Sequence, residues 1–138
     1  MRPLPSSGNP PVVRTDFSNE DAWSDIRRVI GAPVGEHRFL ANVNFVDDRE
    51  YEEAGKEALL PLLEAARPHH GFAILVDHAA IVRPEHPLLV IDVFESGREF
   101  RAIPGTVQSI ENNLSLGNMD FEEFADSVDA DGVFRGFA

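Results

Sequence analysis

Cysteine is absent from this sequence of 138 residues. The chain can therefore form no disulfide, offers no thiolate nucleophile and supplies no cysteine ligand to zinc or to an iron–sulfur cluster. Long apolar runs are also lacking: the longest, such as 87–91, have the length of a strand, whereas a membrane-spanning helix needs roughly 20 apolar residues. We therefore expect neither thiol chemistry nor a segment that spans a bilayer.

Positive charge is scarce. The formal net charge is −12, and Lys56 is the only lysine. Nucleic acids and anionic membranes are bound mainly through Lys and Arg, so neither is an expected partner. The negative charge is concentrated between Arg101 and Arg135, in a segment (102–134) that we call the acidic window. This window contains no Lys, Arg or His, and its acidic residues are Glu111, Asp120, Glu122, Glu123, Asp126, Asp129 and Asp131.

Residues 1–11 are rich in proline and serine, and no apolar segment follows Arg2. This composition predicts a flexible N-terminal segment rather than a secretory signal, and hence a cytoplasmic location. The remaining residues, 12–138, contain no internal repeat or linker. The hydrophobic content of the chain, 43%, is enough for one core, so we expect a single α/β domain over 12–138.

Apolar residues at helical spacing predict a first helix from about Asn19 to Ile30. Ser18, directly before it, is a favourable N-cap residue. Trp23 and Ile26 lie on the apolar face of this segment, so we expect both side chains to be buried in the core.

A second helical pattern covers residues 51–66. Pro61 interrupts it, because proline removes a backbone amide and clashes with the preceding turn, and we expect a kink or a restart there. Pro68 should end the helix.

The C-terminal part of the chain predicts two further helices. Thr106 is placed to cap a short one. Asp120 and Glu123 have the spacing of a capping box for another, in which Phe121 and Phe124 would face the core. The acidic residues of this segment should then face solvent: Glu122, Glu123 and Asp126.

Alternating or continuous apolar runs predict strands over 12–13, 38–46, 72–76, 88–94, 99–103 and 133–137. Residues 95–98 include a glycine and suit a hairpin loop, so the two strands that flank them should be antiparallel neighbours. Strands and helices alternate in the first half, which favours parallel pairing there. We predict an α+β (mixed α/β) fold with one mixed parallel and antiparallel sheet of about five to six strands, covered by helices.

Several segments also show a likeness to a known family. They are VRTDF (13–17), PEHP (84–87), SIENNL (109–114), NMDFEEFA (118–125) and DGVFRGF (131–137). Together they resemble an uncharacterised actinobacterial, Streptomyces-type family of small acidic proteins, a domain of unknown function, over nearly the whole chain from Val12. The resemblance implies a single domain and an actinobacterial source, and it assigns no catalytic or binding residue.

No metal site is expected. The histidines lack the spacing that places two imidazoles on one helical face: His37, His69, His70, His78 and His86. His69 and His70 suit a solvated loop. From Ser127 the chain matches part of a calcium-binding loop, but Ala138 stands where a glutamate should bind calcium through both oxygens. We expect an aspartate-rich turn there, and no stoichiometric zinc or calcium.

Three residues are candidates for acid–base chemistry. His78 and His86 flank the ends of apolar strands, where clefts form in α/β sheets. Asp92 lies inside an apolar strand, where burial would alter the proton affinity of its carboxyl group. The structural alternative, which we favour, is that both histidines only hydrogen-bond the loop 77–88 and that alternation turns Asp92 to solvent.

Cofactor motifs are missing, because the sequence contains no G-x-G-x-x-G, P-loop or G-x-S-x-G pattern. We therefore expect no cofactor. Three asparagines, Asn112, Asn113 and Asn118, are expected to cap turns rather than to bind a ligand.

Two hypotheses of different classes follow. The first is a non-enzymatic protein-binding or regulatory module, similar to an immunity protein or inhibitor, that meets a basic or polar protein partner through an acidic C-terminal surface. That surface would consist of Glu111, Glu122, Glu123, Asp126, Asp129 and Asp131. The second is a small enzyme acting on a polar substrate through His78, His86 and Asp92. A simpler alternative is that the acidity only keeps the domain soluble.

Overall fold

The computed structural model describes residues 1–5, 7–66, 71–94 and 98–137. In chain order the elements of these residues are β1 (Pro11–Arg14), α1 (Glu20–Gly31), β2 (Asn44–Val46), the 3-10 helix η1 (Arg49–Tyr51), α2 (Lys56–Ala66), β3 (Phe72–Val76), α3 (His78–Val82), β4 (Leu88–Asp92), β5 (Glu99–Ala102), the 3-10 helix η2 (Pro104–Thr106), α4 (Val107–Ser115), α5 (Phe121–Ala125) and β6 (Val133–Phe134).

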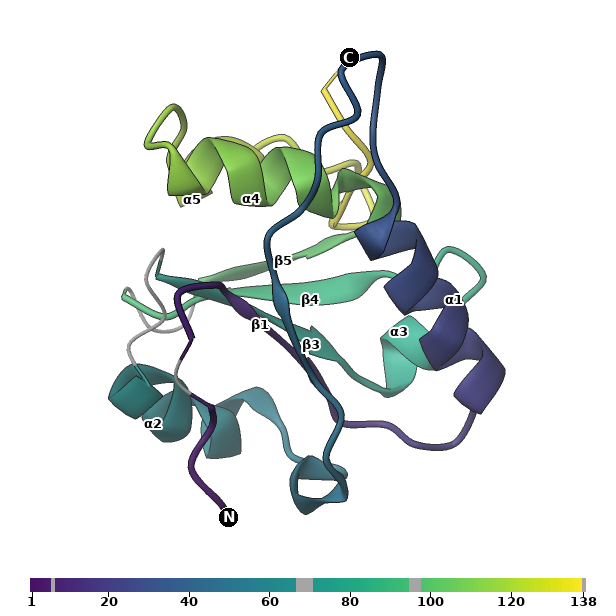
Figure 1. The fold of residues 1–138 in the computed structure, drawn as a ribbon, viewed down its shortest axis with the longest axis vertical. Helices are drawn as coiled ribbons and strands as arrows, with labels where there is room; N and C mark the ends of the chain where they lie inside the picture. The colour runs from purple at the N-terminus through teal and green to yellow at the C-terminus, as the bar shows by residue number, and fades with distance from the viewer. Residues whose placement is uncertain (6, 67–70, 95–97, 138) are drawn as a thin grey trace.

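The strands form one sheet in the order β2-β1-β3-β4-β5-β6 (Figure 1). β1 is parallel to both β2 and β3, β4 is antiparallel to β3 and β5, and β6 is parallel to β5. Two crossovers build the parallel half: α1 joins β1 to β2, and α2 joins β2 to β3. The predicted α+β class and the mixed sheet are confirmed.

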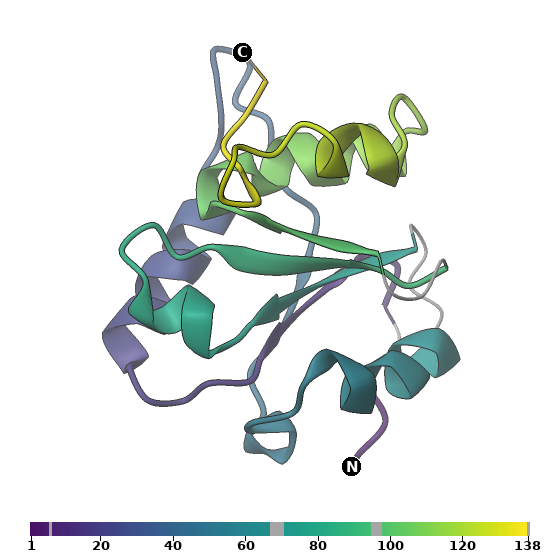
Figure 2. The same ribbon diagram turned by 180° about the vertical axis from the view of Figure 1, so that it is seen from behind.

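Helices cover both faces of this sheet (Figures 1 and 2). α1, α3, α4 and α5 pack on one face, in a core that includes Trp23, Ile26 and Phe124. α2 and η1 pack on the other face, where Leu59 and Tyr51 are buried. Successive residues of β3 alternate between the two cores, and all five are buried. This central position explains the unbroken apolar sequence of β3.

The first helix agrees with its prediction except at the cap. α1 begins at Glu20, and Trp23 and Ile26 are fully buried, as predicted. The N-cap is Asn19, whose side-chain oxygen accepts a hydrogen bond from a backbone amide of the first turn at 3.0 Å. Ser18 does not cap the helix, because its hydroxyl donates to the carboxylate of Asp16 instead.

The strand predicted over 38–46 is shorter than expected, since only Asn44–Val46 pair with β1. Arg38 has a φ of 54°, and Val34 and Phe39 form an isolated antiparallel bridge that closes a loop. Phe39 is consequently 53% exposed instead of facing the core. Leu40 is also exposed, at 51%. Three further apolar residues of the segment are partly buried against the core, and only the last of them belongs to β2: Ala41, Val43 and Phe45.

The second helix begins at Lys56 rather than near Tyr51, and it continues through Pro61. Tyr51 belongs to η1 and is buried, and its hydroxyl donates to the carbonyl oxygens of Arg2 and Pro3. The apolar spacing therefore indicated correctly that Tyr51 is buried, but the α-helix that it predicted at this residue is absent. These contacts also place residues 2–3 against the domain; the flexibility of the N-terminal segment stays a prediction. Pro68 lies outside the described residues.

α3 was not predicted. Asp77 caps it, because its carboxylate accepts a hydrogen bond from the amide of Ala80 at 3.2 Å. β4 and β5 are antiparallel neighbours as predicted, and residues 95–97 of their connection lie outside the described residues.

The last two helices begin where the sequence indicated, after Thr106 and Asp120, but neither side chain makes a capping hydrogen bond in the described part of the chain. Thr106 donates to the carbonyl of Ile103 instead. Phe121 and Phe124 are buried, as predicted. The acidic residues of α5 and its end are exposed, also as predicted: Glu122, Glu123 and Asp126.

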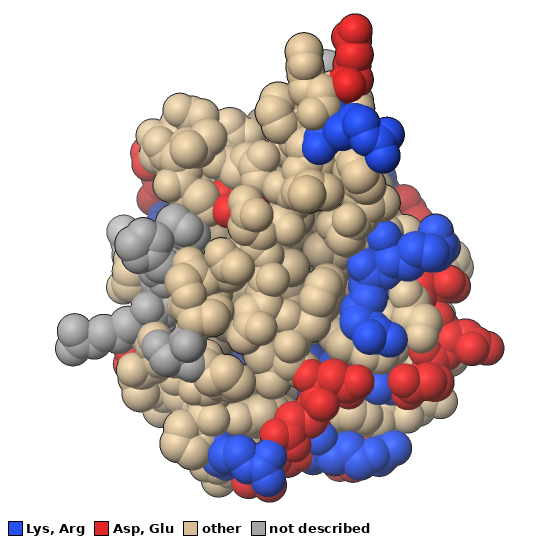
Figure 3. All heavy atoms as spheres, viewed as in Figure 1, with Lys and Arg blue, Asp and Glu red and all other residues tan. Residues whose placement is uncertain are grey.

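Charge is distributed unevenly over the surface. On the face shown in Figure 3, charged side chains gather over α1 and toward the bottom of the view, whereas the centre of the face carries few. Among the described residues, we find no helix with the length and apolar character needed to cross a membrane.

Candidate functional site

One concave region lies where β1 and β3 end. In open α/β sheets, ligands bind beyond the carboxyl ends of neighbouring parallel strands whose connections leave in opposite directions. β1 and β3 form such a pair, because β1 leads through α1 to β2 on one side and β3 leads through α3 to β4 on the other. A hollow of about 360 Å³ opens there, which we call the carboxyl-end cleft. Its polar lining residues are Thr15, Asp16, Glu53, Asp77 and His78.

Asp16 and His78 meet in this cleft. His78 Nδ1 lies 2.7 Å from Asp16 Oδ2, and the imidazole is 73% exposed while the carboxylate is 14% exposed. The other carboxylate oxygen accepts hydrogen bonds from the amide and the hydroxyl of Ser18. Burial acts to raise the pKa of Asp16, but the hydrogen bonds from Ser18 and His78 outweigh it and lower that pKa below its usual value of 3.8. The charged carboxylate therefore fixes the orientation of the ring.

Acid should weaken the fold through Asp16. Because its pKa is lower in the folded chain than the reference value of 3.8, its contribution to stability is complete above that pH and is lost as the pH falls through the lowered folded pKa. We expect the free energy of unfolding to decline on acidification below about pH 4, and to decline less in Asp16→Asn. Urea unfolding midpoints at a series of acidic pH values measure this difference. Identical pH dependence in the two proteins would contradict it.

Asp77, the second carboxylate at this end of β3, is occupied by structural contacts. Both of its oxygens accept hydrogen bonds from Arg101, each at 2.8 Å, in addition to capping α3. This paired hydrogen bonding raises the pKa of Arg101 above its usual value. The Arg101–Asp77 pair thus ties β5 to the start of α3 and largely neutralises Asp77.

Arg14 lies at the end of β1, directly before the cleft residue Thr15. It is 2% exposed and donates to Glu20 at 2.8 Å and to Asp47 at 3.2 Å. Its Nε also donates to the carbonyl of Asp16 at 3.2 Å. Arg14 therefore links the end of β1 to α1 and to the residue after β2.

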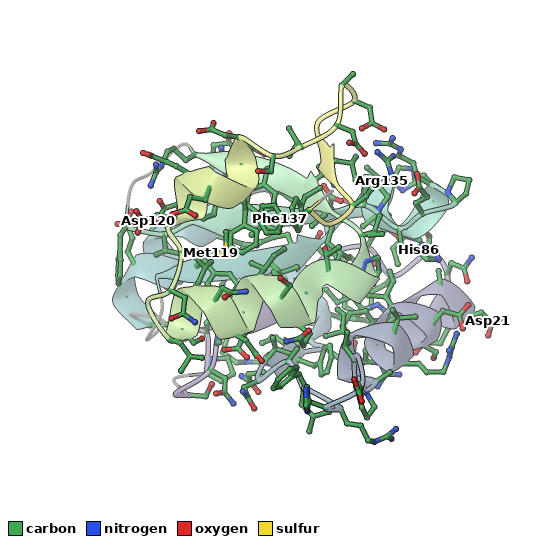
Figure 4. The ribbon with its side chains drawn as sticks, turned by 90° about the horizontal axis from the view of Figure 1, so that it is seen from above. Asp21, His86, Met119, Asp120, Arg135 and Phe137 are labelled. Carbon is green, nitrogen blue, oxygen red and sulfur yellow. The ribbon has the colours of Figure 1, made fainter. Side chains whose placement is uncertain are left out.

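A second concave region lies beside α5, and we call it the α5 hollow. Its volume is about 440 Å³, and its walls include the apolar residues Phe72, Phe94, Leu114 and Met119. Charged residues line it as well: Asp92, Arg98, Asp120 and Glu122. Figure 4 shows Met119 and Asp120 side by side at this end of the molecule.

Arg98 organises the charges of the α5 hollow. It donates to the carboxylates of Asp92 and Glu122, and its guanidinium lies 5.4 Å from the ring centroid of Phe121. The structure thus brings together Asp92 and Glu122, which the sequence had assigned to different hypotheses. The expectation that Asp92 faces solvent is wrong: it is 6% exposed, because both faces of the sheet are covered.

The three acid–base candidates do not converge. Asp92 pairs with Phe72 at the start of β3, whereas His78 follows the end of that strand, so the two lie roughly 15 Å apart along the sheet. His86 has a φ of 51°, and its Nδ1 lies 2.8 Å from the carbonyl oxygen of Ala80, inside the loop 77–88. His86 thus has the contact within the loop that the favoured alternative describes, whereas for His78 that alternative is wrong, because its partner Asp16 lies outside the loop.

Glu111 is not part of an acidic surface. It is 1% exposed, and one carboxylate oxygen accepts hydrogen bonds from the backbone amide and the side chain of Asn42, at 2.7 and 3.1 Å. Asn112 also donates to this oxygen, and Ser115 donates to the other carboxylate oxygen. Its position within α4 turns it toward the irregular segment before β2, which needs a hydrogen-bond acceptor there.

The two neighbouring asparagines of α4 do not cap turns as expected. Asn112 also donates to the carbonyl of Leu40 at 2.9 Å, and Asn113 donates to the carbonyl of Ser109 at 2.8 Å. Both side chains therefore satisfy backbone groups from within a helix.

Asp129 and Asp131 bind an arginine within the chain. Arg135 pairs with Asp129 at 2.8 Å, with Asp131 at 2.7 Å and with Glu85 at 2.8 Å. Hydrogen bonding to Arg135 lowers the pKa of Glu85 and that of Asp131 below their usual values. Figure 4 shows Arg135 at the end of the molecule that also holds His86.

The aspartate-rich turn therefore serves as an arginine-binding turn. Across the described ranges, no group of three or more His, Asp and Glu side chains is arranged to hold a metal ion. His69 and His70 lie outside those ranges, and the expectation that no metal is bound stays a prediction.

Sequence reasoning missed Asp16 and Arg98. Asp16 lies three residues before Asn19, the N-cap of α1. The spacing Asp16–Ser18 is typical of a turn in which the carboxylate accepts a hydrogen bond from the amide two residues later. That signal predicts the turn but not the approach of His78, which is 62 positions away. Arg98 gave no local signal, because its partners Asp92 and Glu122 are joined to it only by the fold.

The described residues thus form a mixed sheet covered by helices, with a cleft at the ends of the parallel strands β1 and β3 and a charged hollow at the opposite end of β3. Residues 9–137 match the model of a family described as a domain of unknown function, DUF6924, and the chain belongs to this family. A search of curated proteins finds no match. The family match confirms the resemblance to a domain of unknown function over nearly the whole chain.

Proposed function

We propose that this protein is a protein-binding or regulatory module, of the immunity or inhibitor kind, which meets a basic protein partner through the surface around α5. The observation that supports it best is a set of exposed carboxylates beside the α5 hollow, whose lining is partly apolar. We define the α5 surface as the residues Asp120, Glu122, Glu123 and Asp126.

Burial of the apolar side of α5 turns two of these carboxylates, Glu123 and Asp126, toward solvent. Phe121 and Phe124 are buried on the inner side of α5, so Glu123 and Asp126 must project into solvent. Neither forms an ion pair with any described residue. Their field is therefore available to steer a cationic surface toward the α5 hollow, where apolar groups of the partner would be buried.

The acidic set is narrower than the sequence alone indicated. Glu111 is buried, while Asp129 and Asp131 are engaged by Arg135, so the proposal rests on α5 and its flanks. The same proposal includes three expectations that rest on sequence patterns. They are an actinobacterial source, a cytoplasmic location and a partner that is neither a nucleic acid nor a membrane.

Charge reversal on α5 should slow association with such a partner. We expect Glu123→Lys/Asp126→Lys to reduce the association rate roughly tenfold at low salt, because steering by opposite charges accounts for at least that factor in steered complexes. The difference should disappear near 1 M salt, where the Debye length is only about 3 Å. Glu122 is kept, because it holds Arg98 in place. Stopped-flow or surface-based kinetics with a captured partner give the rates.

The matched control is Glu57→Lys/Glu64→Lys on α2, which changes the net charge equally on the opposite face of the sheet. Its association rate should stay within about twofold of wild type, because its charges lie far from the α5 surface. Equal slowing by both double variants would show that the net charge of the protein, rather than the α5 surface, determines the association rate, and would contradict the proposal. A rate independent of salt would also contradict the proposed surface.

A further inference from the structure

The Asp16–His78 pair has a geometry suited to chemistry rather than to structure alone. It lies in the carboxyl-end cleft, at the opposite end of β3 from the α5 hollow, so a role for it is independent of the proposed binding surface. Its two members come from the loop after β1 and the start of α3, which the sheet places side by side.

The hydrogen bond between the two residues determines which ring nitrogen is available. With Nδ1 donating to the Asp16 carboxylate, Nε2 is the unprotonated nitrogen of the neutral imidazole and can accept a proton. No other described residue hydrogen-bonds the ring, and 73% of the side chain is exposed to the cleft and to solvent. The carboxylate is in turn fixed by Ser18. A base oriented by a third group is the arrangement found in general acid–base sites.

The cleft also selects the charge of a ligand. Glu53 lines it with an exposed carboxylate that forms no ion pair with any described residue. Its amide donates to the carbonyl of Thr15 at 2.7 Å, which holds Glu53 at the end of β1 despite a left-handed φ of 63°. With Asp77 neutralised by Arg101, the remaining charge of the cleft comes from Asp16 and Glu53 and is negative. Anionic ligands are therefore disfavoured, and neutral or cationic ones fit.

We propose that His78 and Asp16 form a general acid–base site that hydrolyses small neutral or cationic carboxylic esters. His78 Nε2 removes a proton from water while the water oxygen bonds to the ester carbonyl carbon and the carbonyl electron pair moves to oxygen. The tetrahedral intermediate then collapses, the bond from carbon to the leaving oxygen breaks, and the proton on Nε2 passes to that oxygen. The products are a carboxylic acid and an alcohol, so no oxidant or cofactor is consumed.

His78 is the catalytic residue of this site and Asp16 is a positioning residue. We choose esters over amides as substrates because the oxygen of an ester is a better leaving group than the nitrogen of an amide. General acid–base catalysis by one pair of residues is therefore sufficient for ester hydrolysis. A volume of about 360 Å³ admits a ligand of fragment size.

The test compares ester hydrolysis by the wild type with that by single variants. With p-nitrophenyl acetate, a neutral probe, we expect His78→Gln to lower the rate at least roughly tenfold, since a positioned general base contributes about 10² or more. The matched control is His37→Gln, an exposed histidine outside the cleft, which should stay within about twofold of wild type. Equal, small losses in both variants would mean that each imidazole acts as free imidazole does, and would overturn the proposal.

Two further probes test the charge of the cleft. The p-nitrophenyl ester of glycine is cationic, and the p-nitrophenyl monoester of succinic acid is anionic. Relative to their rates with free imidazole, the cationic ester should react about tenfold faster than the anionic one, and Glu53→Gln should reduce this preference. A preference for the anionic ester would contradict the assignment.

Asp16 requires a readout that a purely structural role would not change. Nitrogen-15 NMR of the His78 ring should show the Nδ1–H tautomer in the wild type and a shift toward Nε2–H in Asp16→Asn, together with a rate loss of about tenfold. The tryptophan emission of Trp23, which is fully buried, reports that each variant is folded. An unchanged tautomer and an unchanged rate in a folded Asp16→Asn would remove Asp16 from the site.

Discussion

Replacing Glu111 by alanine should lower the free energy of unfolding by about 3 kcal/mol, because buried hydrogen-bond donors lose their common acceptor. The Glu111 carboxylate is 1% exposed and accepts from the amide of Asn42 at 2.7 Å, from the side chain of Asn42 at 3.1 Å and from the side chain of Asn112 at 2.8 Å. Ser115 also donates to it. These bonds fasten the irregular segment before β2 to α4, so the loss should also loosen that segment.

Glutamine at the same position separates the hydrogen bonds from the charge. Glu111→Gln keeps one oxygen for the donors of Asn42 and Asn112, and its amide group can donate to the hydroxyl of Ser115. We therefore expect a change below about 1 kcal/mol in Glu111→Gln. Glu123→Ala, on the exposed side of α5, should change the free energy by less than about 0.5 kcal/mol. Urea unfolding of the variants gives the values, and a cost for Glu111→Ala no larger than that for Glu123→Ala would show that water satisfies the donors.

Local periodicity was sufficient for the elements that use it most directly. The apolar stripe of α1 predicted the burial of Trp23 and Ile26, and the unbroken apolar run of β3 predicted a strand. In α1 the apolar spacing follows from the one face that lies against the core, whereas β3 is apolar at every position because cores cover both faces of the sheet.

Two elements were predicted wrongly from the spacing of apolar residues. Tyr51 is buried from a 3-10 turn, and Phe39 is exposed because the chain closes a loop between Val34 and Phe39. The error at Tyr51 arises because an apolar pattern indicates contact with the core but not the backbone conformation that makes the contact. The error at Phe39 is of another kind, because the pattern indicated burial and the loop leaves this side chain 53% exposed.

The candidate sites depended on pairs that are distant in sequence. Residue types indicated that His78 and Glu122 deserved consideration, but their partners Asp16 and Arg98 were set by the order of strands in the sheet. Asp92 was misplaced for a related reason, because alternation predicts a solvent-facing side only when one face of the sheet is open. Which faces helices cover is a property of the whole chain.

Replacing Phe124 by alanine should lower the free energy of unfolding by about 3 to 5 kcal/mol, the usual range for removing a fully buried phenylalanine side chain. Phe124 is 0% exposed, and its ring centroid lies 5.3 Å from that of Phe134, 5.4 Å from that of Phe137 and 6.5 Å from that of Phe100. Its removal therefore leaves a cavity where α5, β5 and β6 meet.

The control for this substitution is Phe137→Ala. Phe137 contacts the same cluster, at 5.0 Å from Phe134, but it is 51% exposed, so we expect a loss below about 1 kcal/mol. Trp23 is the single tryptophan of the chain and belongs to the same core as Phe124, so its emission reports unfolding of that core. In Phe124→Ala the urea midpoint measured by Trp23 emission should fall together with the midpoint measured by far-ultraviolet circular dichroism.

A different result would show that α5 unfolds as a separate unit: an unchanged Trp23 midpoint together with faster amide exchange in α5. The carboxylates of the α5 surface would then be positioned by a local equilibrium rather than by the global stability of the core.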